Sequence, residues 1–252
     1  MKTMSFNVLC GGPIGKRWRS RRPLIARQIR DIDPDTFGLQ EAHSGWMDYV
    51  CRHFPDYDYS GVGRDDGKRG GEFSPVFFKK DKFELLDSGN FWLSETPEKP
   101  SKSWKAACIR ICSWALLKDR SSGKQFVQMN THLDHVSEEA RVKGIGLVVD
   151  KIKSFDVPVI CTGDFNTDEG SESYKIMTAD VMGDVKYLAE DTDSGCTYTG
   201  FDPEKMKDNS PIDFIFVKKS DIAVKTYKIS RELINGKLPS DHFAISAEIE
   251  LK

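Results

Sequence analysis

A carboxylate and an amide follow a short apolar segment in the second half of the chain. Residues 157–161 are almost continuously apolar, which predicts a buried β-strand, and polar residues follow directly after Gly163. Asp164 and Asn166 are two positions apart, so in extended backbone both side chains point to the same side. Hard cations and phosphoryl oxygens favour such a pair, a negative oxygen beside a neutral donor. The alternative is a plain polar turn, because Asn and Asp are common turn residues.

Other polar side chains stand at the ends of predicted strands in the same way. They are Asn7, Glu41, His132, Asp213, and the consecutive pair Asp241 and His242. Two more charged residues, Glu72 and Arg110, interrupt predicted strands. Active sites of sheet proteins gather where strand ends converge, so we expect these side chains to meet in one site.

The apolar pattern predicts many strands and few helices. Helical spacing of Leu24, Ile25, Ile29 and Ile32 predicts a helix from about residue 21, which Pro34 ends. Further helices are expected over 44–53 and 138–153, with irregular helical structure over 171–190. Strands are expected at 3–9, 36–40, 57–62, 73–78, 83–93, 107–117, 125–133, 157–161, 212–217, 222–229 and 243–251.

Two glycine-containing segments should interrupt these elements. Gly11-Gly12-Pro13 breaks the first strand, and the glycine-rich loop 63–71 is expected to be mobile. Helices between some of the strands predict an α/β (α+β) fold, a sandwich of two sheets clad by helices. The chain shows no internal repeat, linker or low-complexity tract, so we expect a single domain over residues 1–252.

Composition excludes several classes of protein. The net charge of −2 is not that of a basic nucleic-acid coat, and no apolar run is long enough to span a membrane. None of the six cysteines forms a Cys-x-x-Cys pair, so we interpret them as reduced thiols of a cytoplasmic protein. No signal peptide is visible at Met1; a cleaved leader stays open as an alternative. The basic segment 16–22 either contacts phosphates or is the solvated flank of the first helix.

Six short motifs, in this order, resemble the endonuclease/exonuclease/phosphatase (DNase I-like) superfamily of magnesium-dependent phosphodiesterases and phosphomonoesterases. They are Phe6-Asn7-Val8, Gly38-Leu39-Gln40-Glu41, Asn130-Thr131-His132, Gly163-Asp164-Phe165-Asn166, Ile212-Asp213-Phe214-Ile215 and Ser240-Asp241-His242. The resemblance covers nearly the whole chain, and residues 91–98 look like a bacterial-type subgroup of uncharacterised hydrolases. It implies a four-layer sandwich, with two mixed β-sheets packed face to face and helices outside.

Chemistry and the resemblance together assign roles around a metal. Glu41 offers an anionic oxygen suited to Mg²⁺ or Mn²⁺, and the resemblance implies Asn7 and Asp241 as further contributors. Asp164 would orient the attacking water or act as its base, while Asn166 holds that water or a phosphoryl oxygen. His242 would stabilise charge on the phosphorus oxygens, or else act as the general base.

The remaining candidates support or bind the substrate. Asp213 is the expected partner of His242, and the resemblance implies Glu72 as the partner of His132. Arg110, in an otherwise apolar predicted strand, should meet a phosphate or a carboxylate. Trp104 either stacks on a base or sugar or packs on the sheet edge.

Other histidines carry no expected role. His43, His53 and His135 are assigned none, and His135 should face away from His132 in a continuing strand. The abasic-site endonuclease branch has a Tyr where this chain has His132, which argues against that activity.

The leading functional hypothesis is therefore a metal-dependent hydrolase of phosphodiesters, in nucleic acid or a small metabolite. The alternative is a phosphomonoesterase acting on a phosphorylated sugar, inositol or nucleotide. A non-catalytic binding module is a remote third, because none of the six family positions is missing. The expected partner is a phosphate ester, possibly nucleic acid, and the expected state is a monomer.

Overall fold

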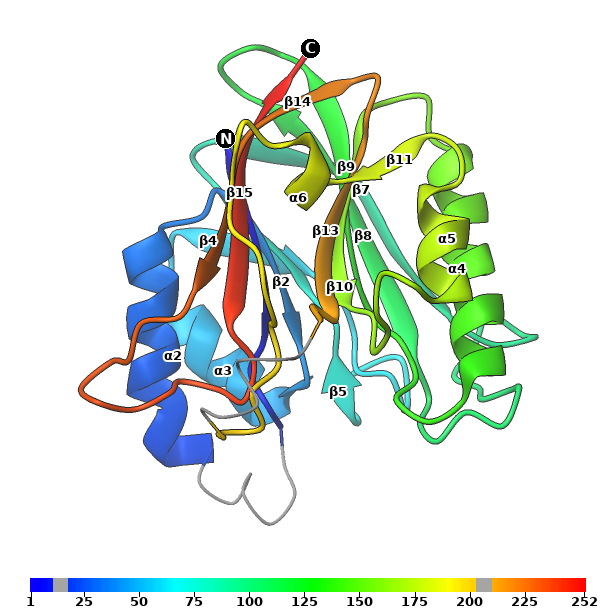
Figure 1. Ribbon diagram of the computed structural model, residues 1–252, viewed down its shortest axis with the longest axis horizontal. Helices are drawn as coiled ribbons and strands as arrows, with labels where there is room; N and C mark the ends of the chain where they lie inside the picture. Colours follow the sequence, from blue (N-terminus) through cyan, green and yellow to red (C-terminus); the bar gives the residue numbers. More distant parts are fainter. Residues whose placement is uncertain (11–17, 203–209) are drawn as a thin grey trace.

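Two β-sheets packed face to face form the middle of the protein, and helices cover their outer faces (Figure 1). The computed structural model describes residues 1–10, 18–202 and 210–252. Both ends of the chain lie at the same end of the molecule, at the top of Figure 1. The four-layer α/β sandwich predicted from the sequence is confirmed.

The first sheet has seven strands in the order β12-β14-β15-β1-β2-β6-β4. β1 and β2 run parallel and are the central pair, while β15 joins β1 antiparallel. The bounds are β1 Lys2–Asn7, β2 Thr36–Gln40, β4 Tyr57–Ser60, β6 Val76–Lys79, β12 Asp191–Thr192, β14 Ile222–Ser230 and β15 Ala244–Leu251.

The second sheet has six strands in the order β11-β13-β10-β9-β8-β7, and a separate two-stranded sheet pairs β3 with β5. β9 and β10 run parallel, with His132 directly beside Asp164. The bounds are β3 Ala42–His43, β5 Glu72–Phe73, β7 Phe83–Trp92, β8 Ile111–Asp119, β9 Gln125–His132, β10 Val159–Asp164, β11 Met182–Asp184 and β13 Asp213–Lys218.

Each sheet buries its outer face under helices. α2 (Trp18–Ile32) and α3 (Ser44–His53) pack on the first sheet through a core that includes Ile25, Ile29 and Trp46. α4 (Glu138–Lys153) and α5 (Glu172–Thr178) cover the second sheet, and α6 (Val185–Leu188) is a single turn. α4 begins at Ser137, whose hydroxyl accepts the Ala140 N–H. The predicted bounds of α3 and α4 are confirmed.

A layer of buried polar side chains crosses the interface between the two sheets. Gln40 Nε2 lies 2.7 Å from Asn130 Oδ1, and Asn130 Nδ2 donates to the main-chain carbonyl of Leu39 at 2.7 Å. Gly38 lies under this layer: a Cβ there would fall 2.3 Å from Asn130 Oδ1 and 2.5 Å from Thr162 Oγ1. The close approach of β2 to the second sheet therefore depends on glycine at position 38.

Replacing Gly38 by alanine should destabilise the fold. The added methyl must push apart a hydrogen-bonded buried layer, which costs about 1–3 kcal/mol of unfolding free energy. Gly146→Ala in α4 is the matched control, because a Cβ at Gly146 meets no atom within 4 Å. Alanine in a helix is favoured over glycine by about 1 kcal/mol, so the control should be slightly stabilising. Urea unfolding of both variants measures this, and equal stabilities would contradict it.

Two sequence expectations about strand bounds are wrong, and the place of Arg110 changes with the second. The strand predicted at 73–78 is two strands, because Pro75 has no N–H for a continuous ladder. The strand predicted at 107–117 begins only at Ile111, since the N–H groups of Ala107 and Cys108 donate to Asp134 Oδ2. Arg110 therefore precedes β8 and does not lie inside it.

The glycine-rich loop 63–71 is closed by its own hydrogen bonds, which argues against the expected mobility. Gly63 donates to the Lys68 carbonyl at 2.9 Å, and Asp66 Oδ1 accepts from the Lys68 and Gly70 N–H groups. The indole of Trp92 donates to the Arg64 carbonyl at 2.6 Å and fixes the loop to β7.

Part of the expected basic segment can be placed. Gly11-Gly12-Pro13, Lys16 and Arg17 lie outside the described residues. α2 begins at Trp18, earlier than predicted; Arg19 is exposed, whereas Arg21 is buried. The segment is thus not a uniformly solvated flank in its described part.

Candidate active site

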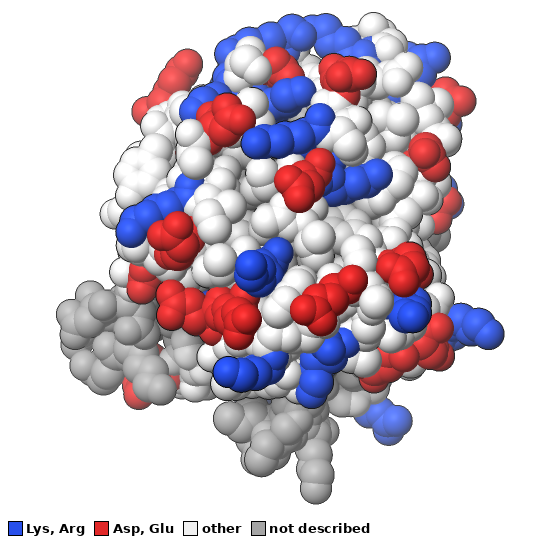
Figure 2. Space-filling model, turned by 90° about the vertical axis from the view of Figure 1, so that its right-hand side faces the viewer, with Lys and Arg blue, Asp and Glu red and all other residues white. Residues whose placement is uncertain are grey.

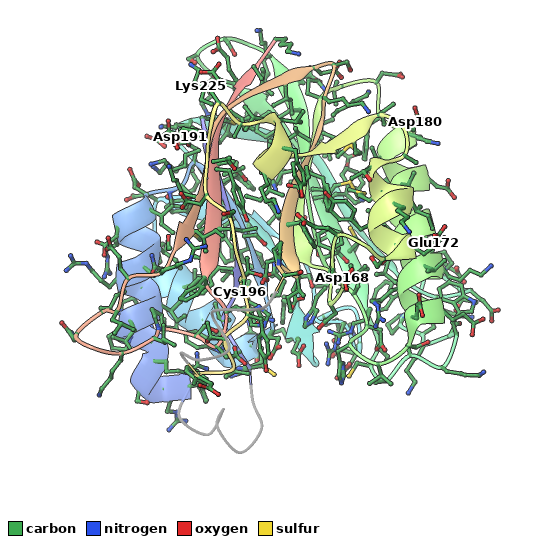
Figure 3. The ribbon with its side chains drawn as sticks, in the orientation of Figure 1. Asp168, Glu172, Asp180, Asp191, Cys196 and Lys225 are labelled. Atoms are coloured by element: carbon green, nitrogen blue, oxygen red, sulfur yellow. The ribbon has the colours of Figure 1, made fainter. Side chains whose placement is uncertain are left out.

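The predicted site residues converge at one end of the two sheets. β1, β2, β9 and β10 all end there, and β13 and β15 begin there, because they run antiparallel to β10 and β1. This is the lower end of β10 in Figure 1, beside β5, and Figure 3 labels Asp168 just beyond it, while Lys225 lies at the opposite end.

A pocket of about 420 Å³ opens at this end. Eight of the predicted residues line it: Glu41, Glu72, Arg110, His132, Asp164, Asn166, Asp241 and His242. Asn7 and Asp213 are buried behind it and contact lining residues. A larger hollow of about 550 Å³ lies elsewhere, between α2, α3 and β6, and contains none of the predicted residues.

Asp164, Asp213 and His242 form a buried cluster in the floor of the pocket. Asp164 and Asp213 are directly paired across β10 and β13, which brings two carboxylates together. His242 Nδ1 lies 2.9 Å from Asp213 Oδ2, the contact expected from the sequence, and His242 Nε2 lies 3.7 Å from Asp164 Oδ2.

The protonation of this cluster follows from its charges. Burial alone would lower the pKa of His242, but Asp213 and Asp164 outweigh it and raise the pKa, which favours imidazolium. Burial, with Asp213 close by, raises the pKa of the Asp164 carboxyl.

Asn166 connects the end of β10 to His132. Its backbone has φ +48°, a left-handed conformation that Asn tolerates, and its N–H donates to Asp164 Oδ1 at 2.9 Å. Its Nδ2 lies 2.9 Å from His132 Nε2 and 3.0 Å from the Leu133 carbonyl. Burial, followed by Arg110, lowers the pKa of His132, so the neutral ring accepts the Asn166 N–H.

The expected pairing of Glu72 with His132 is absent. Glu72 Oε2 lies 2.5 Å from Arg64 Nη1, and Glu72 Oε1 accepts from Cys10 Sγ at 2.9 Å. His132 Nδ1 is buried and has no hydrogen-bond partner among the described residues. The physical reason is that Arg64, a full cation at hydrogen-bond distance, attracts the carboxylate more strongly than a neutral imidazole does.

Glu41 and Asp241 supply two further carboxylates that line the pocket. Glu41, just after β2, has φ +59°, and its two oxygens accept from Asn7 Nδ2 at 3.1 Å and from the Cys10 N–H at 2.9 Å. Burial alone would raise the pKa of Glu41, but these two hydrogen bonds outweigh it and lower the pKa. Burial raises the pKa of Asp241, and nearby Glu41 adds to the rise.

Asn7 is buried and hydrogen-bonds two carboxylates of the site. Its Oδ1 accepts the Leu9 N–H at 2.9 Å, and its Nδ2 donates to Glu41 Oε1 and to Asp164 Oδ2, the latter at 2.9 Å. In this arrangement Asn7 orients two carboxylates, and its predicted role in the metal shell stays a prediction.

The donor set fits a hard divalent cation. Glu41 and Asp241 are both partly buried and line the same pocket, and the charge of Glu41 raises the pKa of Asp241. Oxygen ligands of this kind are those that Mg²⁺ and Mn²⁺ prefer. Among the described residues, Cys10, Glu41 and Glu72 also bring their ligand atoms within 4.8 Å of one another, as do Asp164, Asp213 and His242.

A further wall of the pocket is cationic, and the sequence reasoning predicted only Arg110 of its residues. Arg64, Arg110 and His135 line it together, and Arg110 Nη2 lies 3.0 Å from His135 Nδ1. Arg110 is only 5% exposed; its Nε lies 3.8 Å from Oδ2 of the buried Asp134, while its Nη1 has no partner among the described residues. A buried guanidinium with free N–H groups is costly unless an anion meets it.

One prediction about a histidine needs correction, and Trp104 lies outside the lining of the pocket. His135 does not face away from His132, because β9 ends at His132 and the chain turns back into the pocket. Trp104 is not among the residues that line the pocket; its carbonyl accepts from Ser137 Oγ at 2.6 Å. The lining aromatic residue is Tyr198, packed against His242 with ring centroids 4.9 Å apart.

Some signal for the missed residues was present in the sequence. Arg64 stands near the start of the glycine-rich loop 63–71, and this loop directly precedes Glu72. His135 lies three positions after His132 of the Asn130-Thr131-His132 motif. Tyr198 lies in a segment without periodicity, and only its isolated bridge to His242 brings it to the site.

The sequence profile of the Endonuclease/Exonuclease/phosphatase family matches residues 4–242. The chain belongs to this family, and the predicted resemblance is confirmed. Its solved structural relatives include bacterial members, and the DNase I-like arrangement of two sheets and outer helices is the one described above.

Two bacterial structures match over the whole chain. The endonuclease/exonuclease/phosphatase from Bacteroides vulgatus is 38% identical, covers 100% of this chain and 98% of its own, and has a TM-score of 0.94. A mannosyl-6-phosphatase from Bacteroides thetaiotaomicron is 37% identical, with 100% of both chains covered and a TM-score of 0.91.

Eukaryotic relatives are more distant. Nocturnin from Xenopus laevis is 26% identical over 201 residues, which are 73% of this chain and 50% of that protein. The chain thus spans about half the length of this curated relative. Family and site together define a hydrolase of the endonuclease/exonuclease/phosphatase class.

Proposed function

We propose that the protein is a phosphomonoesterase, dependent on Mg²⁺ or Mn²⁺, that hydrolyses a small phosphorylated molecule such as a sugar phosphate. The observation that carries this choice is the buried Arg110, whose Nη1 has no partner among the described residues, beside Arg64 in one wall of the pocket. A phosphomonoester carries close to two negative charges at neutral pH and three terminal oxygens, whereas a diester carries one charge. A double-arginine wall suits the more highly charged group.

Shape and relatives support a small substrate. The pocket is compact, at about 420 Å³, and a bacterial phosphatase of a sugar phosphate matches the full length of the chain. Figure 2 shows Lys and Arg interspersed with Asp and Glu over most of the face that carries α4 and α5. Basic side chains adjoin one another only along its upper edge, at the end away from the pocket. A polymer would favour such a track leading to the site.

The protein's own residues supply most of the proposed chemistry. Asp164 accepts hydrogen bonds from Asn7 and Asn166, which aim it to orient the attacking water and take its proton. His242, held by Asp213, places positive charge where the phosphorus oxygens gain negative charge. The arginine wall fixes the phosphoryl group for in-line attack. Asn166, whose Nδ2 donates to His132 and Leu133, holds the attacking water through its amide oxygen. A divalent cation held by Glu41 and Asp241 would add charge stabilisation at the same oxygens.

A phosphodiester substrate is the second candidate. It is favoured by distant curated relatives that are named as nucleases, such as the Ccr4 exoribonuclease subunit from Mycosarcoma maydis, 21% identical over 93% of this chain and 46% of that protein. The binding-module hypothesis has less support, because the predicted catalytic side chains meet in one pocket.

Location and assembly are further proposals. We propose a cytoplasmic monomer with a single catalytic domain over residues 1–252, and the free cysteines support a reducing compartment. Among the residues that the structure describes, no helix is long and apolar enough to cross a membrane.

Hydrolysis assays test the proposal. The substrates are p-nitrophenyl phosphate, bis-p-nitrophenyl phosphate and a panel of hexose 6-phosphates, each with Mg²⁺, with Mn²⁺ or with a chelator. We expect metal-dependent turnover of monoesters and loss of turnover with the chelator. In Arg110→Met, kcat/KM for monoesters should fall about tenfold to a hundredfold, because charge-assisted hydrogen bonds are lost. Faster turnover of the diester than of every monoester would overturn the choice of substrate.

A further inference from the structure

The buried guanidinium of Arg21 donates its hydrogen bonds to main-chain carbonyls. It belongs to the first turns of α2 and is 6% exposed. Its Nη1 donates to the Val8 carbonyl at 2.8 Å and to the Pro239 carbonyl at 3.0 Å, and its Nη2 donates to the Leu9 carbonyl at 2.7 Å. Burial of a guanidinium is costly, so these three bonds compensate a large desolvation penalty.

These carbonyls belong to two segments at the proposed metal site, one that holds Glu41 and one that carries Asp241. Val8 and Leu9 lead from β1 to Cys10, whose N–H holds Glu41 Oε2 at 2.9 Å. Pro239 stands two residues before Asp241. The segments are far apart in sequence, and Arg21 bonds to both at once.

Neighbouring side chains reinforce the same junction. Ser240 Oγ donates to the Asn7 carbonyl at 2.7 Å, which is a second link between the segments. The guanidinium of Arg21 lies over the fully buried ring of Trp46, 5.6 Å from its centroid. Trp46 Nε1 in turn donates to the Leu9 carbonyl at 3.4 Å.

The backbone at this junction needs such support. Leu9 has φ +53°, a left-handed conformation that a branched side chain adopts at a cost, and it persists only where the surroundings hold it. Arg21 and Trp46 both bond to the Leu9 carbonyl. The conformation in turn delivers the Cys10 N–H to Glu41.

We propose that Arg21 is a positioning residue, which fixes the segment that holds Glu41 relative to the segment that carries Asp241, so that both carboxylates can bind one divalent cation. The affinity for the cation, more than the chemical step, depends on it. This inference rests on the proposed metal-dependent function. It differs from a simple charge effect, because a cation beside Glu41 and Asp241 would by Coulomb repulsion weaken metal binding.

Metal binding without substrate provides the test. Mn²⁺ titration by electron paramagnetic resonance, or Mg²⁺ titration by calorimetry, is compared for the wild type, Arg21→Lys and Arg21→Met. Lysine keeps the charge but cannot bridge three carbonyls in the same geometry. We expect the dissociation constant to rise about tenfold in both variants, as when supports around a metal site are removed. At saturating metal, kcat should stay near the wild-type value.

Opposite results separate the alternatives. Tighter binding in Arg21→Met with unchanged binding in Arg21→Lys would show that charge repulsion dominates, and the proposal would fail. Unchanged binding in both would also overturn it. If the wild type bound no cation, the proposed function would fail first.

Two further variants control for folding. Arg22→Met, at the next position of α2, where the side chain lies over Trp18 and Tyr49, should leave metal binding unchanged. If Arg21→Met does not fold, Ser240→Ala removes the second link without changing charge, together with the 3.2 Å bond from Ser240 Oγ to Asp241 Oδ1, and should also raise the dissociation constant. Wild-type affinity in that variant and in Arg21→Lys would refute the proposal.

Discussion

Asp164→Asn should remove nearly all turnover and leave the fold intact. The carboxylate faces the pocket beside His242, at the place where an attacking water would lie, and asparagine cannot take a proton from it. A positioned general base contributes on the order of 10²–10⁴ in rate, so kcat should fall by about that factor. The substitution keeps size and shape, and Asn166 can still donate to the amide oxygen.

A buried carboxylate outside the pocket provides the control. Asp184 is 4% exposed, caps α6 and accepts from Tyr174 Oη at 3.0 Å. Asp184→Asn should disturb the fold as much as or more than Asp164→Asn while keeping wild-type kcat. Steady-state kinetics with near-ultraviolet circular dichroism measures both, and substantial turnover by Asp164→Asn would refute the mechanism.

His242→Gln should reduce kcat by about 10²–10³, the range seen when a transition-state charge stabiliser is removed. Asp213→Asn should give a smaller loss, since the imidazole stays but loses the carboxylate that holds it at 2.9 Å. His53→Gln is the control, because His53 is exposed at the end of α3 and should not affect kcat.

The pH dependence of kcat distinguishes the two roles of His242. The pKa of His242 is raised by Asp213 and Asp164 despite burial, so the ring is protonated below that raised value. If the cation stabilises charge, turnover falls as pH rises through the raised pKa of His242. On the acid side it falls as the base Asp164, whose pKa is raised by burial and by Asp213, takes up a proton. If neutral His242 is the general base, turnover falls instead as pH drops through the same pKa. We expect the first profile.

The positions of most site residues follow from the sequence because strands end where polar residues begin. Asp164 and Asn166 follow a buried apolar segment, and Glu41 follows another, so a sandwich whose parallel strands share one end brings them together. Periodicity also sufficed for the helices α3 and α4, whose predicted bounds match. Local propensity and apolar spacing determine these features, and both are properties of short segments.

Contacts between distant segments determine which of the site residues touch one another. Whether Glu72 meets His132 or Arg64 depends on how the loop 63–71 closes, and Trp92 anchors that loop from β7. Arg110 and His135 face each other only because Asp134 draws the N–H groups of Ala107 and Cys108 away from a strand ladder.

Arg21 is the clearest example of a residue whose surroundings depend on tertiary contacts and not on local sequence. The sequence places it in a basic segment at the start of a helix, where exposure and burial are equally consistent with the spacing. The packed structure buries it against Trp46 and bonds it to segments 13 and 218 residues away. The sequence by itself thus determined the elements and the inventory of catalytic groups. Tertiary packing decided which of those groups touch, because hydrogen bonds and ion pairs between remote segments depend on distances that no local pattern encodes.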